Sequence, residues 1–182
     1  MRRIRYGVAM SLDGYIADAN GGADWIVMDP EIDFNAMFAQ FDTFLMGRRT
    51  YEGMAKYGGA PTPGITKVVF SRTLNQRDHP GVTILNDNWE DAVRALREKP
   101  GKDIWLFGGG SLCQSFVNAG LLDGVDVGII PVLLGGGIPF LATPVKTTKL
   151  KLLRHKLYKK SGIVSLEYEV TREGKKRTRA RA

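Results

Sequence analysis

The sequence of 182 residues is poor in cysteine and histidine, which limits the kinds of site that it can build. Its one cysteine, Cys113, excludes a disulfide within the chain, as in proteins of a reducing cytoplasm. Neither His79 nor His155 has a second histidine or cysteine at the spacing of metal ligands. We therefore expect no metal site, and we expect Cys113 to pack in the core rather than act as a nucleophile.

Long apolar runs are also missing. No stretch approaches the roughly 20 apolar residues that a membrane-spanning helix needs. The apolar run near the N-terminus is interrupted by Asp13 and Gly14 before it reaches the length of a signal peptide. We expect a soluble, cytoplasmic protein with no membrane partner.

The excess of positive charge is confined to the C-terminus. The formal net charge is +7, from 26 basic and 19 acidic residues, but five of the basic residues lie in the final GKKRTRARA. Without this segment the chain is close to neutral. We expect one domain over residues 1–172 and a flexible basic tail over 173–182. Binding of nucleic acid, or of an acidic partner by the tail, stays open as an alternative.

The apolar pattern predicts strands and helices that alternate along the chain. Expected strands cover residues 4–10, 43–46, 66–71, 82–86, 103–107 and 125–136, and expected helices cover 29–41, 47–58, 88–101 and 111–123. Such alternation implies right-handed crossovers and a mostly parallel sheet that is covered on both faces. Residues 149–158 and 163–170 are expected to add an antiparallel hairpin, which makes the sheet mixed.

Two expected helices have clear start signals. In DPEIDFNAMFAQF, residues 29–41, Asp29 is expected to cap the helix and Pro30 to occupy its first turn. Asn88 is expected to cap the helix over residues 88–101.

The segment IWLFGGGSLCQSF, residues 104–116, joins an apolar strand to three glycines and a helix. The backbone N–H groups of such a turn can bind an anion at the positive end of the helix dipole. The alternative is a tight connection with Ser111 as a helix cap. The segment lacks the G-x-G-x-x-G spacing of the Rossmann fingerprint.

Basic and hydroxyl side chains follow two other expected strands. Arg48, Arg49 and Thr50 begin a helix after one strand, and Ser71 and Arg72 follow the next. Arginine forms forked hydrogen bonds to phosphate, and ligands collect at the carboxyl ends of parallel strands. Together with the glycine turn, these residues predict a site for an elongated ligand with several phosphates, such as a dinucleotide.

The segments VAMSLDGYIA, LMGRRTYEG, VVFSRTL, WLFGGGSL and IIPVLLGGGIPFL occur in this order. As a set, over about residues 3–170, they resemble the dihydrofolate reductase superfamily. They are more similar to the reductase domain of bacterial bifunctional riboflavin-pathway deaminase-reductases. The resemblance implies a single three-layer α/β/α domain, an NADPH cofactor and a homodimer formed near the C-terminal strands.

The resemblance also implies a place for each motif around NADPH. Arg48 and Arg49, with Gly47 and Thr50, would hold the adenosine side, and Ser71 and Arg72 would lie near the adenine ribose and its phosphate. The pyrophosphate would lie on residues 108–112, and Ala9 and Ile16 would lie beside the nicotinamide. The full cofactor set is Ala9, Ile16, Gly47, Arg48, Arg49, Thr50, Ser71, Arg72, Gly108, Gly109, Gly110, Ser111 and Leu112.

The same resemblance places Asp13 and Trp25 beside the substrate. Asp13 is the first candidate to orient the substrate or to relay a proton, and Asp33 is the second. The alternative for Asp13 is the first residue of an Asp-Gly turn, and the alternative for Asp33 is a favourable charge at a helix start.

We therefore expect an oxidoreductase that transfers a hydride from NADPH to a small heterocycle. The leading reaction is the reduction of 5-amino-6-(5-phosphoribosylamino)uracil in riboflavin synthesis, although no basic group for the substrate's phosphate is identified. Dihydrofolate reduction and a non-catalytic nucleotide-binding module are the alternatives. The zinc-binding signature of a deaminase half is missing, so we expect a stand-alone reductase.

Overall fold

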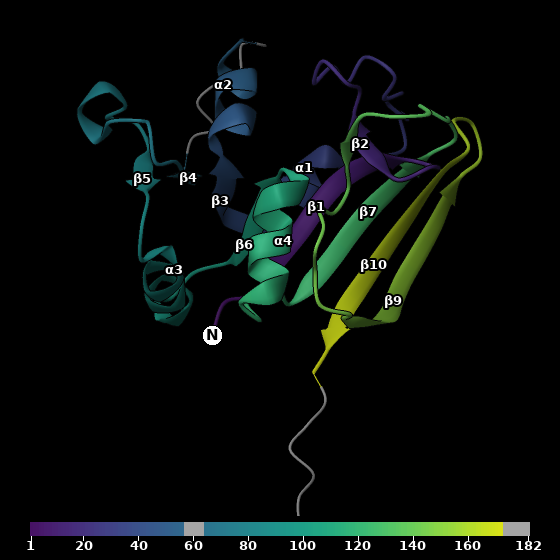
Figure 1. Cartoon of the computed structure of the whole chain (residues 1–182). Helices are drawn as coiled ribbons and strands as arrows, with labels where there is room; N and C mark the ends of the chain where they lie inside the picture. The colour runs from purple at the N-terminus through teal and green to yellow at the C-terminus, as the bar shows by residue number, and fades with distance from the viewer. Residues whose placement is uncertain (57–63, 173–182) are drawn as a thin grey trace, which may run out of the picture.

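A computed structural model describes residues 1–56 and 64–172, which form a mixed sheet with helices on its sides (Figure 1). The eight strands of the sheet lie in the order β5-β4-β3-β6-β1-β7-β10-β9. All neighbouring pairs are parallel except those of β10 with β7 and β9. The strands are β1 (Ile4–Ser11), β3 (Phe41–Gly47), β4 (Thr66–Phe70), β5 (Thr83–Leu85), β6 (Asp103–Gly108), β7 (Gly124–Ile130), β9 (Lys149–Tyr158) and β10 (Ile163–Thr171). The mixed sheet and its C-terminal hairpin confirm the expected α/β architecture.

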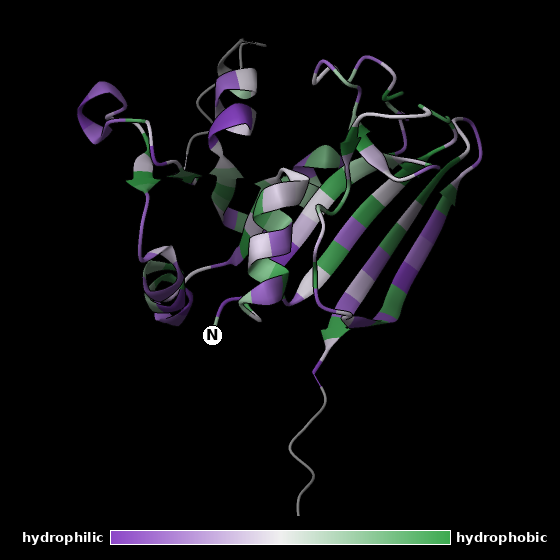
Figure 2. Ribbon diagram, viewed as in Figure 1, coloured by the Kyte–Doolittle hydropathy of each residue, from purple (hydrophilic) through white to green (hydrophobic). Residues whose placement is uncertain are grey.

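The helices pack on opposite faces of this sheet. They are α1 (Phe34–Phe38), α2 (Arg48–Lys56), α3 (Trp89–Glu98) and α4 (Gly110–Asn118), with a 3-10 turn, η1 (Gln76–Asp78). Successive residues of a strand point to opposite faces. In β6, Ile104 and Leu106 lie in the core with α3 and α4, whereas Trp105 between them packs with residues of α1 and α2. Figure 2 shows apolar and polar residues in alternation along β7 and β10, at the other side of the sheet.

The first expected helix is much shorter than its pattern predicts. It covers only Phe34–Phe38, and its N-cap is Asp33, whose side chain accepts a hydrogen bond from the N–H of Ala36. Asp29 is instead buried and accepts a hydrogen bond from the N–H of Ser161, in the turn between β9 and β10. Phe41 begins β3. The prediction of a helix from residue 29 to residue 41 was therefore wrong. Asp29, the expected cap, is instead held by its hydrogen bond from Ser161.

Asn88 does precede α3, as expected, but it adopts the left-handed conformation and its side chain makes no capping hydrogen bond. The structure adds two short strands that the pattern did not predict, β2 (Tyr15–Ala17) and β8 (Ile138–Pro139), which pair with each other.

Strand β9 departs from the expectation that both faces of the sheet are covered. Every residue of this strand except Tyr158 is exposed, including Leu150, Leu152 and Leu157. Since β9 is also the last strand in the sheet, one end of the sheet is open to solvent.

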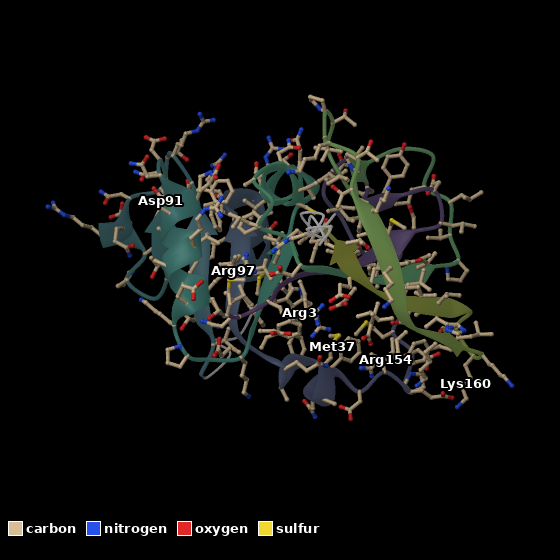
Figure 3. The ribbon with its side chains drawn as sticks, turned by 90° about the horizontal axis from the view of Figure 1, so that it is seen from below. Arg3, Met37, Asp91, Arg97, Arg154 and Lys160 are labelled. Carbon is tan, nitrogen blue, oxygen red and sulfur yellow. The ribbon has the colours of Figure 1, made fainter. Side chains whose placement is uncertain are left out.

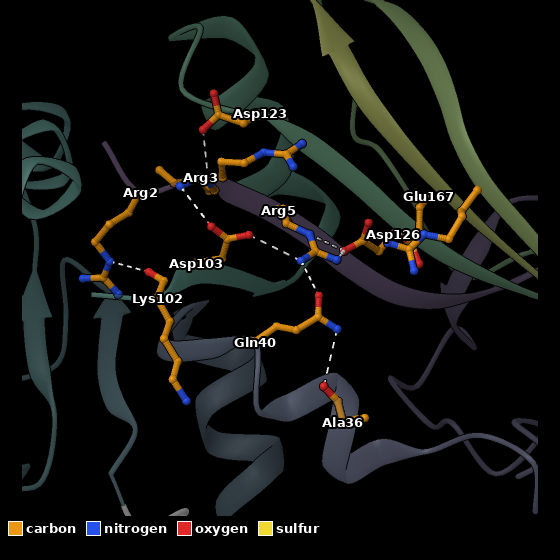
Figure 4. A network of polar contacts seen from close by, with 12 residues as sticks. Arg2, Arg3, Arg5, Ala36, Gln40, Lys102, Asp103, Asp123, Asp126 and Glu167 are labelled. Carbon is orange, nitrogen blue, oxygen red and sulfur yellow. Dashed lines mark hydrogen bonds and ion pairs between the residues drawn. The ribbon is translucent and has the colours of Figure 1, made fainter. Parts of the chain in front are cut away.

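A network of charged residues holds the amino ends of the central strands together (Figure 4). Arg5 in β1 pairs with Asp126 in β7 at 2.6 Å and with Asp103 in β6 at 3.4 Å. Asp123 accepts hydrogen bonds from the N–H of Ile4 and from the buried Arg97. This network lies at the opposite end of the sheet from the glycine turn after β6, so it fixes strand order without taking part in a site there.

No helix within residues 1–56 and 64–172 is long and apolar enough to cross a membrane. The expected tail, residues 173–182, lies outside the described residues.

Candidate functional site

The turns that follow β3 and β6 meet at the carboxyl edge of the sheet (upper part of Figure 1). A Cβ atom placed on Gly47 would lie 3.9 Å from the carbonyl oxygen of Gly108, and one placed on Gly108 would lie 3.8 Å from Oγ1 of Thr50. A Cβ atom on Gly109 would lie 3.8 Å from Cδ1 of Ile16 in β2. The structure therefore brings together five residues that the sequence predicted for one ligand.

The glycine turn itself is tightly packed. A side chain on Gly110 would collide with the carbonyl oxygen of Pro139 in β8, so this position requires glycine. Gly108 has a φ of +138°, which also favours glycine, and the Gly108–Gly109 peptide bond is cis. The backbone here can approach a ligand closely because no side chain intervenes.

Helix α4 points its first N–H groups towards this turn. It begins at Gly110, and the N–H groups of Leu112 and Cys113 both donate to the carbonyl oxygen of Gly109. The N–H groups of Gly110 and Ser111 belong to the first turn, where a helix offers no partner of its own. They are the donors that an anion at this helix end would use.

Ser111 does not cap the helix. Gly109 occupies the N-cap position, and Ser111 lies one residue inside α4 with an exposed side chain. The alternative in which the Ser111 side chain capped the helix was wrong. Its N–H remains at the helix end, and Leu112 packs against the core behind it.

At the start of α2 the two arginines have different surroundings. Both are exposed. Arg48 pairs with Glu52, one turn further along the helix, at 3.3 Å. Arg49 forms no ion pair with any of the residues that the structure describes. Cations at a helix N-terminus are disfavoured unless an anion is near. Arg49 is thus the better placed of the two to receive a phosphate.

Ser71 has a structural task after β4. Its Oγ accepts hydrogen bonds from the N–H groups of Thr73 and Leu74 at 3.1 and 3.0 Å, and the residue is buried. These bonds close a tight turn that leaves Arg72 exposed at the same edge of the sheet as Arg49. Ser71 therefore shapes the turn, and Arg72 is the side chain that can reach a ligand.

On the other side of the glycine turn, Trp25 packs in a small apolar cluster with Ala9, Ile130 and Ile163. Its indole Nε1 is buried and has no hydrogen-bond partner among the described residues. A buried donor without an acceptor is costly, so a ligand that supplies an acceptor here gains affinity. The structure thus places Ala9 and Trp25, predicted for nicotinamide and substrate, in one cluster.

Asp13 lies at the end of β1 and is fully engaged by hydrogen bonds. It accepts one from the hydroxyl of Ser11 at 2.6 Å, and others from the N–H groups of Leu134 at 3.1 Å and Gly135 at 2.7 Å. The Ser11 bond, supported by the two N–H groups, lowers the pKa of Asp13. At neutral pH the side chain is an anion that holds the loop 131–137 in place.

Sequence reasoning missed this role of Leu134 and Gly135. The run LLGGG was visible, but only the folded chain shows which carboxylate its N–H groups would meet. Asp33, the second candidate for catalysis, is exposed and caps α1. The structure does not bring Asp33 and Asp13 together by any hydrogen bond among the described residues.

Two buried groups with raised pKa values lie nearby but serve packing. Burial raises the pKa of Cys113 to about 12, so the thiol stays protonated. Burial also raises the pKa of Tyr6, whose hydroxyl donates to the carbonyl oxygen of Phe140. Among the described residues, no group of His, Cys, Asp and Glu could hold a metal ion.

A separate hollow of about 590 Å³ lies where α4 ends and β10 leaves the sheet. Lys146, Thr148, Val170 and Arg172 are among its lining residues. It shares no residue with the strand-end turns and is not part of the candidate site.

The chain matches a known protein family over most of its length. The sequence model of the family described as RibD C-terminal domain matches residues 2–164. The uncharacterized protein YyaP of Bacillus subtilis is 37% identical over 179 residues, which cover 92% of this chain and 94% of that protein.

Two solved structures share the fold. A protein of Shewanella sp. PV-4, provisionally assigned to riboflavin biosynthesis, superimposes with a TM-score of 0.79 and 26% identity, covering 94% of this chain and all of that one. Dihydrofolate reductase of Enterococcus faecalis, solved with NADP(H), has a TM-score of 0.64 and 17% identity over 92% of this chain and 94% of that one. The fold is thus that of dihydrofolate reductase, as the sequence motifs predicted.

Proposed function

The chain belongs to the RibD C-terminal domain family, and from this we propose that it is a reductase that uses NADPH to reduce a small heterocycle. The hydride would go to a C=N or C=O bond of the ring. NADPH, when bound, supplies that hydride, and the residues of this chain bind, orient and shield the reacting groups.

The observation that carries the proposal is the convergence of three ligand-binding features at one sheet edge. First, the backbones of Gly47 and Gly108 lie next to each other without side chains between them. Second, the start of α4 offers free N–H groups. Third, Arg49 and Arg72 are exposed at the same edge. This arrangement fits a dinucleotide with an extra phosphate. The glycines would admit the pyrophosphate, and the arginines would bind the 2′-phosphate that distinguishes NADPH from NADH.

The nicotinamide end would lie by Ala9, Ile16 and Trp25. Ile16 reaches Gly109, and Trp25 packs with Ala9, so the apolar groups cover the ring and exclude water from the transfer. Asp13 contributes by holding the loop after β7, and its lowered pKa makes it an acceptor at neutral pH rather than a proton donor.

As substrate we favour a pyrimidine such as 5-amino-6-(5-phosphoribosylamino)uracil, because the family is named after RibD, which in Corynebacterium ammoniagenes is a riboflavin biosynthesis protein. Dihydrofolate is the second candidate because the fold is shared with dihydrofolate reductase.

The test is the consumption of NADPH, followed by its absorbance, with a pyrimidine and a pterin as substrates. Steady turnover with either supports the proposal and names the ring. Tight binding of NADPH without turnover on the whole panel would instead support a non-catalytic nucleotide-binding module.

We also propose that two copies of the chain associate through β9. Leu150, Leu152 and Leu157 are exposed on this open strand, where they lie opposite Val170, Tyr168 and Val164 of β10. Exposed apolar residues on an edge strand favour association with a second sheet. Sedimentation should give a dimer for the wild type and a monomer for Leu152→Glu. Ala95→Glu, at an exposed position of α3 far from β9 (Figure 1), should stay dimeric; a wild-type monomer would refute the proposal.

A further inference from the structure

The loops on the substrate side of the site carry one sign of charge. We use the name substrate-side loops for residues 12–14, 18–33 and 131–137, which follow β1, β2 and β7. They contain no lysine, arginine or histidine. Their charged residues are Asp13, Asp18, Asp24, Asp29, Glu31 and Asp33. A phosphate on the substrate would therefore meet carboxylates and no guanidinium or ammonium group of these loops.

Backbone N–H groups can bind phosphate without any cation, so the glycine run 135–137 must be considered too. The N–H groups of Leu134 and Gly135 do converge on a single anion. That anion is the carboxylate of Asp13, with its shortest bond at 2.7 Å. The lowered pKa of Asp13 keeps this carboxylate charged at neutral pH. Two donors that could have received a substrate phosphate, the N–H groups of Leu134 and Gly135, are thus already used by the chain itself.

The cations described next to this side lie in β9 and in the turn between β9 and β10. The Nζ atom of Lys156 lies 4.3 Å from the centre of the Tyr158 ring, which packs in the same apolar cluster as the predicted nicotinamide residue. Lys159 and Lys160 are both exposed, and Lys160 lies at the outer edge of the molecule (Figure 3). The charge of Lys160 acts on Asp29, which is buried beside that turn. These lysines lie outside the substrate-side loops, and Lys156 is already engaged by an aromatic ring.

The groups that remain suit an uncharged ring. Leu12 and Leu133 flank the Asp13 contact, because the N–H of Leu12 donates to the carbonyl oxygen of Val132. Both leucines are mostly exposed, at 63% and 71%. Together with the buried indole N–H of Trp25, they offer apolar contact and one neutral donor.

We propose that the substrate is an uncharged heterocycle with a carbonyl acceptor and no phosphate group. This inference rests on the proposed function, because it concerns the substrate of the same reductase site. It retains the pyrimidine ring favoured above and removes the phosphate from its sugar. The adenosine side of the site, with Arg49 and Arg72, keeps its preference for a phosphorylated cofactor. The adenosine side of the site therefore selects for a phosphate, whereas the substrate side selects against one.

The test compares two ligands that differ only in the phosphate. The full chain is first titrated with NADP⁺, and then, with NADP⁺ saturating, with 5-amino-6-(ribosylamino)uracil and with its 5′-phosphate. The unphosphorylated ligand should bind at least about tenfold more tightly. Tighter binding of the phosphorylated ligand would overturn the inference, as would failure of both ligands to bind in the presence of NADP⁺. Failure of NADP⁺ itself to bind, seen in the first titration, would instead refute the proposed cofactor site.

A variant makes the comparison independent of the absolute affinities. Leu133→Lys places an ammonium group next to the filled pair of N–H groups and should strengthen binding of the phosphorylated ligand alone. Ala95→Lys, at an exposed position of α3, is the matched control and should change neither ligand. If Leu133→Lys left the ratio of the two affinities unchanged, the phosphate would not lie on this side of the site and the inference would fall.

Discussion

The carboxylate of Asp13 accepts a hydrogen bond of 2.7 Å from the N–H of Gly135, although 122 positions separate the two residues in the sequence. The bond ties the turn after β1 to the loop after β7. Since the same carboxylate also accepts the hydroxyl of Ser11, the turn, the strand and the loop form one unit. On the proposed substrate side of the site, these bonds hold the turn with Asp13 against the loop 131–137.

Removal of this tie is expected to loosen the loop without harming the cofactor side. Asp13→Ala leaves the N–H groups of Leu134 and Gly135 without their acceptor. Hydrogen exchange at these two positions should become faster, and kcat/KM should fall while the affinity for NADPH is unchanged.

Asp18→Ala is the matched control for that variant. Asp18 also accepts backbone hydrogen bonds, from Asn20 and Gly22, but these lie within its own turn. The control should leave exchange at Leu134 and Gly135 as in the wild type. Slow exchange there in Asp13→Ala would contradict the role assigned to this carboxylate.

The architecture could be predicted because its strands are long and buried. Residues 104–107 of β6, for example, pack alternately into the two cores, so that the sequence shows a continuous apolar run that predicts a buried strand. Strands β2 and β8 were missed because two or three residues carry no period. The neighbouring positions of β6, β1 and β7 in the sheet are supported by the contacts of Arg5 with Asp103 and Asp126, which no local pattern encodes.

The cofactor side of the site could be predicted for a similar reason. Gly47 and Gly108 stand at strand ends, and parallel strands bring their ends to one edge. The substrate side could not, because it depends on contacts between distant loops. Asp29 has all the signals of a helix cap, yet the fold uses it to hold Ser161. The sequence around Asp13 is typical of a turn or of a catalytic group. Neither interpretation predicts its hydrogen bonds with the N–H of Leu134.

Asp29 should make the protein less stable in acid. The hydroxyl and N–H of Ser161, with the N–H of Glu31, lower the pKa of Asp29 in the folded chain. A carboxyl group with a lowered pKa contributes stability above its unfolded value of about 4, and this contribution is lost as the pH falls through the folded value. Asp13 adds to the same trend, whereas Asp126, whose pKa is raised by burial, opposes it.

Urea unfolding of the wild type, Asp29→Asn and Ser161→Ala between about pH 3 and pH 7 measures this dependence. Both variants should be less stable at neutral pH and lose less stability on acidification. If the free energy of unfolding changed with pH to the same extent in all three proteins, Asp29 would not be held as described.

Asp123 should be among the most important residues for stability. Its carboxylate pairs at 2.6 Å with Arg97, whose side chain is only 6% exposed. Asp123→Ala leaves this guanidinium buried without a carboxylate, with only the carbonyl oxygen of Arg2 as an acceptor. The loss should lower the free energy of unfolding by about 3–5 kcal/mol.

Glu90→Ala breaks an exposed pair with Arg94 on α3 and serves as the control. It should cost no more than about 0.5 kcal/mol. Similar losses for the two variants, measured by urea unfolding, would show that the amino-end network does not hold the strands.

Gly110 should tolerate no side chain. Gly110→Ala would force α4 away from the carbonyl oxygen of Pro139, and we expect a loss of at least about 1–3 kcal/mol together with weaker binding of NADPH. Gly53→Ala is the control, because a Cβ atom there meets no atom within 4 Å and the residue lies inside α2. It should be neutral or stabilising by up to about 1 kcal/mol. Thermal unfolding with and without NADPH separates the two effects, and a fully stable Gly110→Ala would contradict the packing described.

The account as a whole depends on NADPH binding at the carboxyl edge of β3, β4 and β6. The most direct measurement is a thermal shift with NADPH and with NADH, repeated for Arg49→Ala and for Arg94→Ala as an arginine control on α3. At a hundred times its dissociation constant, NADPH should stabilise the wild type and the control by about 2.7 kcal/mol. Arg49→Ala should lose roughly 10- to 100-fold in affinity for NADPH and none for NADH. No shift with either cofactor, or equal shifts that Arg49→Ala leaves unchanged, would contradict the account.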